Sequence, residues 1–172
     1  MSEEEQIRLW TERFRLLGAY DPDSWAKSQV KEGIPQYARF IFLRQAWKEI
    51  LDDDDAAWID SEIASAAKRP SGPGAGIGLA LKRILALGAD REDLTEIVRV
   101  MQWELLSRIA YQLSDPGVVE YPDESFPKVN WELFEVDSKN NPLHPIGGLH
   151  ESILDTDPTG REMRPKGISR DG

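Results

Sequence analysis

The stretch that decides the fold is residues 90–117, DREDLTEIVRVMQWELLSRIAYQLSDPG. Large apolar residues recur in it at intervals of three or four over about five turns of an α-helix, and these are Leu94, Ile97, Val98, Met101, Leu105, Ile109 and Leu113. Asp90 is a suitable N-cap, and Asp115-Pro116-Gly117 ends the pattern. We therefore expect one long helix whose apolar stripe faces the core, although such a stripe also serves as a seam between copies of a chain.

The sequence before this stretch predicts several shorter helices. Apolar residues keep helical spacing over 2–17, 22–31, 35–51, 58–68 and 77–88. The glycine-rich run 72–78 follows a helix rather than a strand and lacks the Lys-Ser or Lys-Thr of a phosphate-binding loop, so we expect a connector. Residues 1–115 are therefore expected to form a body of five or six amphipathic helices, packed as an irregular bundle.

The last third of the chain has a different residue composition. It holds seven of the eleven prolines, which leave no room for a long helix. Alternating apolar residues over 129–136 predict a strand with a bulge, and Asn140-Asn141-Pro142 predicts a turn before an edge strand over 143–146. The expected fold is mostly α, with an extended region 116–172 that carries one β-hairpin, packs on the helices within a single domain and has a mobile tail from about residue 158.

Composition excludes several classes of protein. With 40% apolar and 30% charged residues, the 172-residue chain is typical of globular proteins. No apolar run approaches the roughly 20 residues that span a bilayer, and the acidic start Ser2-Glu3-Glu4-Glu5 is unlike a secretory signal. We expect a cytoplasmic protein without a membrane partner. The absence of cysteine excludes disulfides and thiolate metal sites, and no cofactor motif is present, so no cofactor is expected.

The charge predicts the kind of partner. A net charge of −10 disfavours nucleic acid, and Glu49–Glu62 contains seven carboxylates and no lysine or arginine. A tryptophan beside such charges is typical of a binding hot spot. The predicted partner-binding residues are Asp52, Asp53, Asp54, Asp55, Trp58, Asp60 and Glu62. Our main hypothesis is an acidic protein-binding module with a basic partner, and one version of it is an inhibitor or immunity-type protein that masks a nuclease-like target.

A small enzyme is the competing hypothesis. The segment Gly147–Asp157 follows a glycine pair that lets the backbone approach another group closely. Its candidate catalytic residues are His150, Glu151 and Ser152, and its candidate metal ligands, together with His144, are His150, Asp155 and Asp157. They suggest a metal-assisted hydrolase with Glu151 as the base. Neither a His-Glu-x-x-His nor a Gly-x-Ser-x-Gly motif is present, so we favour binding over catalysis. A structural subunit of a homo-oligomer is a third alternative.

Overall fold

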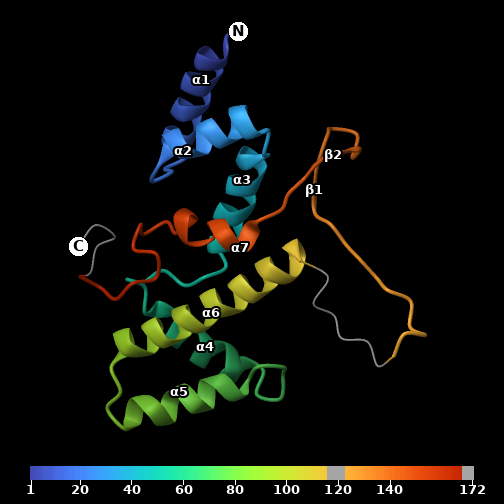
Figure 1. Cartoon of the computed structure of the whole chain (residues 1–172). Coiled ribbons are helices and arrows are strands. Elements are labelled where there is room, and N and C mark those ends of the chain that lie inside the picture. Colours follow the sequence, from blue (N-terminus) through green and yellow to red (C-terminus); the bar gives the residue numbers. More distant parts are fainter. Residues whose placement is uncertain (116–122, 168–172) are drawn as a thin grey trace. The chain divides into compact units, whose positions relative to one another are not determined.

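The computed structural model describes residues 1–115 and 123–167, and within them the chain is mostly helical (Figure 1). It is 57% helix, with seven α-helices and one small antiparallel hairpin near the C-terminus, which confirms the predicted fold class. The described residues form two compact units. We call Glu49–Leu105 the inserted unit, and Met1–Lys48 with the described part of Leu106–Gly172 the terminal unit. This division follows the packing, whereas the sequence boundary at residue 115 followed the change in composition.

The terminal unit begins with two capped helices. Helix α1 (Glu3–Leu16) starts at a capping box, in which the Glu5 backbone N–H donates to Ser2 Oγ at 3.2 Å and the Ser2 N–H donates to Glu5 Oε2 at 2.7 Å. Helix α2 (Pro22–Lys27) starts at Asp21, whose Oδ1 accepts from the Ser24 N–H at 3.1 Å. These starts agree with the sequence, because capping depends on neighbouring residues alone.

The chain then turns through a rare element into the next helix. Residues Ser28–Glu32 form a π-helical turn (η1), which ends at Gly33 in the left-handed conformation with φ +68°. Glycine adopts this conformation without the steric cost that a Cβ would add. Helix α3 (Gln36–Trp47) follows directly after Pro35.

An aromatic cluster holds the helices of the terminal unit together. Phe14 of α1, Trp25 of α2 and Phe40 of α3 are buried, and their ring centroids lie 5.2 to 5.8 Å apart. These separations suit edge-to-face and tilted aromatic pairs. Trp25 therefore belongs to the core and is not an exposed binding residue.

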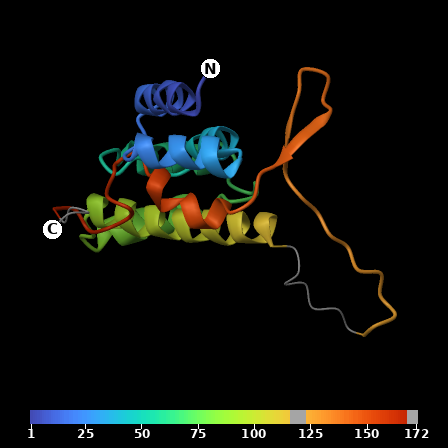
Figure 2. The same ribbon diagram turned by 45° about the horizontal axis from the view of Figure 1, so that its top comes forward.

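The hairpin is shorter than the sequence predicts. Strand β1 (Phe134–Val136) pairs with β2 (Pro142–Pro145) in an irregular antiparallel register, and Figure 2 follows the chain through both strands and the turn. The register shifts between Phe134 and Val136, within the segment where a bulge was expected. The expectation of a strand over 129–133 was wrong, and the indole of Trp131 instead donates to the carbonyl of Gln112 at 2.8 Å.

Two short helical turns follow the hairpin and pack on α3. They are α7 (Leu149–Ser152) and the 3₁₀ turn η3 (Leu154–Thr156), in a segment without a clear helical pattern of apolar residues. The indole N–H of Trp47 donates to the Ile153 carbonyl at 2.9 Å and to Thr156 Oγ1 at 3.1 Å. These hydrogen bonds fix a segment whose sequence alone is too short and polar to show helical periodicity.

The inserted unit contains α4 (Ala57–Lys68), α5 (Gly76–Ala86) and the first part of α6 (Arg91–Ser114). The glycine-rich run connects α4 to α5, as predicted. Gly78 faces α4 so closely that a Cβ there would collide with the Cβ of Ala66. Between α4 and α6, the indole of Trp58 donates to Thr95 Oγ1 at 2.9 Å. No helix in the described part of the chain is long and apolar enough to cross a membrane.

Candidate functional site

Helix α6 buries polar residues and exposes apolar ones within the inserted unit. Thr95 and Arg99 are each only 2% exposed, whereas Ile97, Met101 and Leu105 are 56%, 64% and 59% exposed. The expectation that this stripe faces the core was therefore wrong. Thr95 receives the Trp58 indole, and the Arg99 guanidinium donates to the Leu51 carbonyl, so long-range polar contacts decide which side of the helix is buried.

We define the α6 apolar face as Ile97, Met101 and Leu105. Because they are four residues apart, they form one row along the helix. The inserted unit buries few large apolar side chains, namely Ile50, Ile59 and Leu81. It also exposes apolar residues on α5, which are Ile77, Leu79, Ile84 and Leu87. Exposed apolar side chains that lie in one row of a helix form the kind of surface expected at a site of protein interaction.

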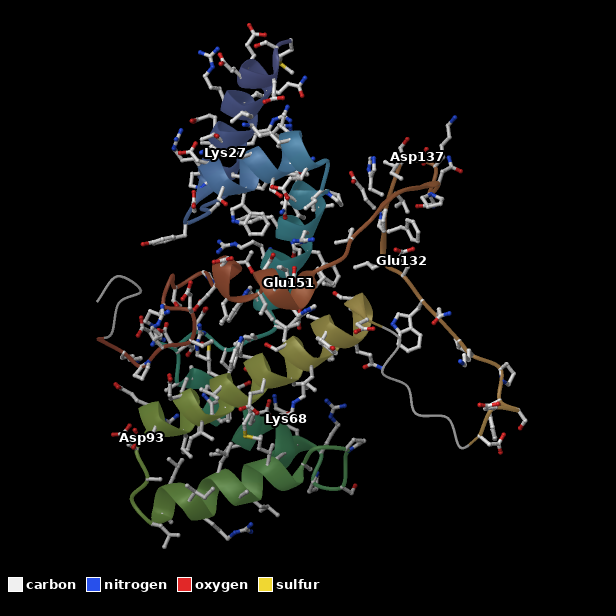
Figure 3. All side chains as sticks on the ribbon, viewed as in Figure 1. Lys27, Lys68, Asp93, Glu132, Asp137 and Glu151 are labelled. Carbon is white, nitrogen blue, oxygen red and sulfur yellow. The ribbon has the colours of Figure 1, made fainter. Side chains whose placement is uncertain are left out.

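Acidic residues lie close to the α6 apolar face along the helix. Asp93, one turn before Ile97, stands near the start of α6 (Figure 3), and Glu104 directly precedes Leu105. The basic residues of this helix are Arg91, Arg99, which is buried, and Arg108. The inserted unit as a whole has twelve acidic and six basic residues, a net charge of −6. The field around this apolar surface is therefore negative.

The residues predicted to bind a partner lie in the same unit, and several also have structural roles. The side chains of Asp52, Asp54, Asp55, Asp60 and Glu62 are exposed, and that of Asp53 is half-buried. Asp55 Oδ1 accepts from the Ala57 N–H at 2.7 Å, and Asp60 pairs with Arg91 at 2.6 Å. Trp58 is half-buried against Thr95. The acidic loop starts at Leu51, whose N–H donates to Gln102 of α6 at 2.9 Å.

The two histidines of the alternative enzyme site have different surroundings. His144 is an exposed residue of β2, with Nδ1 3.4 Å from Glu135 Oε2. His150 lies on α7 with its ring edge-on to Tyr111 at 4.8 Å, and its buried Nδ1 has no hydrogen-bond partner among the described residues. His150 therefore does not bond a backbone carbonyl through that atom.

The other candidate catalytic and metal residues form structural contacts. The backbone of Gly148 approaches Arg39, as the glycine pair suggested, and Arg39 donates to Ser152 Oγ at 3.3 Å. Burial lowers the pKa of Arg39, and the charge of Glu151 on α7 opposes that shift. The Asp157 carboxylate accepts from the Thr159 N–H and hydroxyl, both at 2.9 Å. The Gly160 N–H also donates to the Asp157 carbonyl at 3.0 Å, which closes a β-turn over 157–160.

The geometry does not assemble the proposed metal ligands. In the ranges 1–115 and 123–167, no three His, Asp or Glu side chains lie close enough together to hold a metal ion. His144, His150, Asp155 and Asp157 all fall within these ranges.

A polar cavity in the terminal unit was not predicted from the sequence. It has a volume of about 310 Å³ and is lined by α2, η1, α3, α7 and η3. Its described lining residues are Tyr20, Asp21, Ser24, Trp25, Ser28, Glu32, Gln36, Ser152 and Asp155. The available signal was the recurrence of a polar or phenolic residue at every fourth position from Tyr20 to Gln36.

Comparison of the chain with protein-family models, with curated proteins and with solved structures finds no match.

Proposed function

We propose that the chain is a protein-binding module, and that its inserted unit docks a basic amphipathic helix of another protein on the α6 apolar face. The observation that carries this proposal is the exposure of Ile97, Met101 and Leu105, at 56%, 64% and 59%, in one row of a regular helix. An apolar row at this spacing matches the way a groove or helix face receives a partner helix.

The apolar contact supplies only part of the required affinity. Fully burying one such side chain contributes about 1.5–3 kcal/mol, so completing the burial of three half-exposed ones contributes roughly 3 kcal/mol. A dissociation constant of 1 mM already corresponds to about 4 kcal/mol. A partner must therefore gain further affinity from the charged surroundings or from other apolar residues of the unit.

The charge of the inserted unit favours a basic partner over a second copy of the chain. Two copies that met through this unit would bring together two units of net charge −6. A basic partner would instead be attracted by Asp93, Glu104 and the acidic loop 52–55, which would raise its rate of association at low salt. An inhibitor or immunity-type role would follow if the bound partner were an enzyme.

Site-specific photo-crosslinking in the native cell extract tests this proposal. A photoreactive amino acid is placed at Met101 in one full-length variant and at Leu16, an exposed residue of α1 in the terminal unit, in the control. We expect position 101 to capture one predominant basic protein, with a yield that falls as salt rises, and position 16 not to capture it.

Three results would contradict the proposal. They are identical products from positions 101 and 16, capture of the chain itself at position 101, or recovery of no product. Capture of the chain itself, with a dimer mass by light scattering, would support the homo-oligomer alternative.

A further inference from the structure

We propose a second binding surface in this protein: an aromatic groove of the terminal unit binds a proline-rich segment of another protein, in the polyproline II conformation and with a basic residue beside the prolines. The groove has a volume of about 320 Å³. Its lining residues include Trp10, Gln29, Pro35, Tyr37, Glu135 and His144. All of them belong to the terminal unit, so this inference is independent of the proposed function.

The first argument is the aromatic wall of the groove. Trp10 of α1 is half-buried and Tyr37 of α3 is 40% exposed, and their ring centroids lie 5.4 Å apart with the ring planes inclined at 52°. The two rings are in contact, so they form one continuous aromatic wall, and the ring of Pro35 extends it. Grooves lined by aromatic side chains are a recurring way of binding proline-rich segments.

The second argument is a set of hydrogen-bond donors on the same wall. Within residues 1–115 and 123–167, the Trp10 indole N–H and the Tyr37 hydroxyl have no hydrogen-bond partner. The Gln29 side chain uses only its Oε1, which accepts from the Tyr37 N–H at 2.8 Å, so its NH₂ group is also free. The nitrogens of Trp10 and Gln29 are not among the buried atoms without a partner, so they are accessible to solvent.

These donors match the chemistry of polyproline. A proline residue has a backbone carbonyl but no N–H, so a run of prolines offers acceptors without donors. In the polyproline II conformation the carbonyls make no internal hydrogen bonds and remain available to a partner. A groove whose free groups are an indole N–H, an amide NH₂ and a hydroxyl is therefore complementary to such a segment.

The third argument is the charge at the hairpin side of the groove. Glu135 of β1 is the one acidic residue among the described lining residues, and none of these is lysine or arginine. Its Oε2 lies 3.4 Å from Nδ1 of His144, and its side chain is 37% exposed. A lysine or arginine beside the prolines would be attracted to this carboxylate. Because the pair would remain exposed, it would set the orientation of the segment more than its affinity.

A second copy of the chain is a poorer occupant than another protein. The connector between α4 and α5 contains Arg69-Pro70-Ser71-Gly72-Pro73, which has two prolines and a basic flank. In the folded chain, however, the Gly72 N–H donates to the Arg69 carbonyl at 3.0 Å and closes a turn. Polyproline II is extended and has no internal hydrogen bonds. The folded connector therefore does not have the conformation that the groove requires.

Fluorescence anisotropy with a synthetic peptide tests the proposal. The probe is a labelled run of ten prolines with an arginine at each end, titrated with the full chain at about 0.15 M salt so that exposed charges are screened. We expect saturable binding of this peptide. A peptide with the same arginines around a glycine-serine run should not bind, because it has the charge without the conformation. The proline run flanked by glutamates should bind more weakly than the probe.

Conservative variants locate the binding. Trp10→Phe and Tyr37→Phe each keep a ring and remove one donor, and each should weaken binding about fivefold through the loss of one hydrogen bond. Tyr20→Phe, at an exposed tyrosine outside the groove, is the matched control and should bind like the unmodified chain. Equal thermal unfolding temperatures show that a loss of binding is local.

Several outcomes would overturn the proposal. They are no saturable binding of the probe, equal binding of the glycine-serine or glutamate-flanked peptide, unchanged affinity in both Trp10→Phe and Tyr37→Phe, or equal weakening in Tyr20→Phe. Self-association of the chain that the probe abolishes would assign the groove to a second copy instead. The crosslinking result at Met101 is a separate readout, so failure of either proposal can be recognised without the other.

Discussion

The helices of the terminal unit and those of the inserted unit are covered by different kinds of contact. The terminal unit places Phe14, Trp25 and Phe40 in one buried cluster, whereas the inserted unit leaves Ile97 and Met101 mostly exposed. Both units contain amphipathic helices, so apolar periodicity alone does not separate a core from a binding surface. The difference lies in what else reaches each helix. Aromatic side chains cover the face of α1, and polar contacts occupy the buried side of α6.

The largest expected loss of stability is in the aromatic cluster of the terminal unit. Phe14→Ala removes a fully buried ring and should lower the free energy of unfolding by about 3–5 kcal/mol. Met101→Ala, the matched change on the α6 apolar face, should stay within about 0.5 kcal/mol because that side chain is mostly exposed. Hydrogen exchange resolved by residue measures both. A loss of several kcal/mol in Met101→Ala would show that the α6 apolar face is already covered within the chain.

A smaller effect is expected where the inserted unit is closely packed. Gly78→Ala places a Cβ against Ala66 and 3.2 Å from the Glu62 carbonyl, so α4 and α5 must separate slightly. We expect a loss of roughly 1–3 kcal/mol from overpacking, which exceeds the gain of about 1 kcal/mol in helix propensity. Gly76→Ala has open space and is the control. Equal unfolding midpoints of the two variants in urea would contradict the close packing of this helix pair.

The smallest expected effect is on the stability of the hairpin turn, which belongs neither to the aromatic cluster nor to the α6 apolar face. Hydrogen bonds from Asn141 and Lys139 lower the pKa of Asp137, which stands at the turn between β1 and β2 (Figure 3). The ionised carboxylate therefore stabilises the turn at pH values above its ordinary pKa, and this stabilisation is lost as the pH falls through the lowered pKa. Carbon-detected NMR of the Asp137 carboxyl measures the midpoint. A midpoint at or above the ordinary value would contradict these contacts, and Asp137→Asn should make the turn insensitive to acid.

Local features of this fold could be predicted from the sequence, and long-range ones could not. Helices α1 and α2 begin where the helical spacing of the sequence begins, because their caps, Ser2 and Asp21, bond residues only three positions away. The orientation of α6 could not be predicted, because Trp103 and Leu106 make its other side apolar as well. Contacts from Leu51 and Trp58, 37 to 48 positions away, decide which side is buried.

The candidate sites show the same limit. The acidic residues near the α6 apolar face could be identified from the sequence, because a run of aspartates can be recognised without knowledge of the packing. The sequence did not indicate that His144 and His150 would have different surroundings, because the hairpin and α7 position them independently. The polar cavity combines residues 20–36 with Ser152 and Asp155, and no local pattern predicts that juxtaposition.

The π-helical turn has a consequence for how this protein can change through insertions and deletions. A π-helical turn holds one residue more than the corresponding α-helical turn, so deletion of one residue within Ser28–Glu32 would restore a regular α-helix. The extra residue is taken up within the turn, so the helical positions before and after it would stay as they are. The same deletion inside the regular helix α3 would instead rotate every later residue of that helix by about 100° around its axis. The cavity wall is therefore less sensitive to the loss of one residue at the π-helical turn than to the same loss in the regular helix beside it.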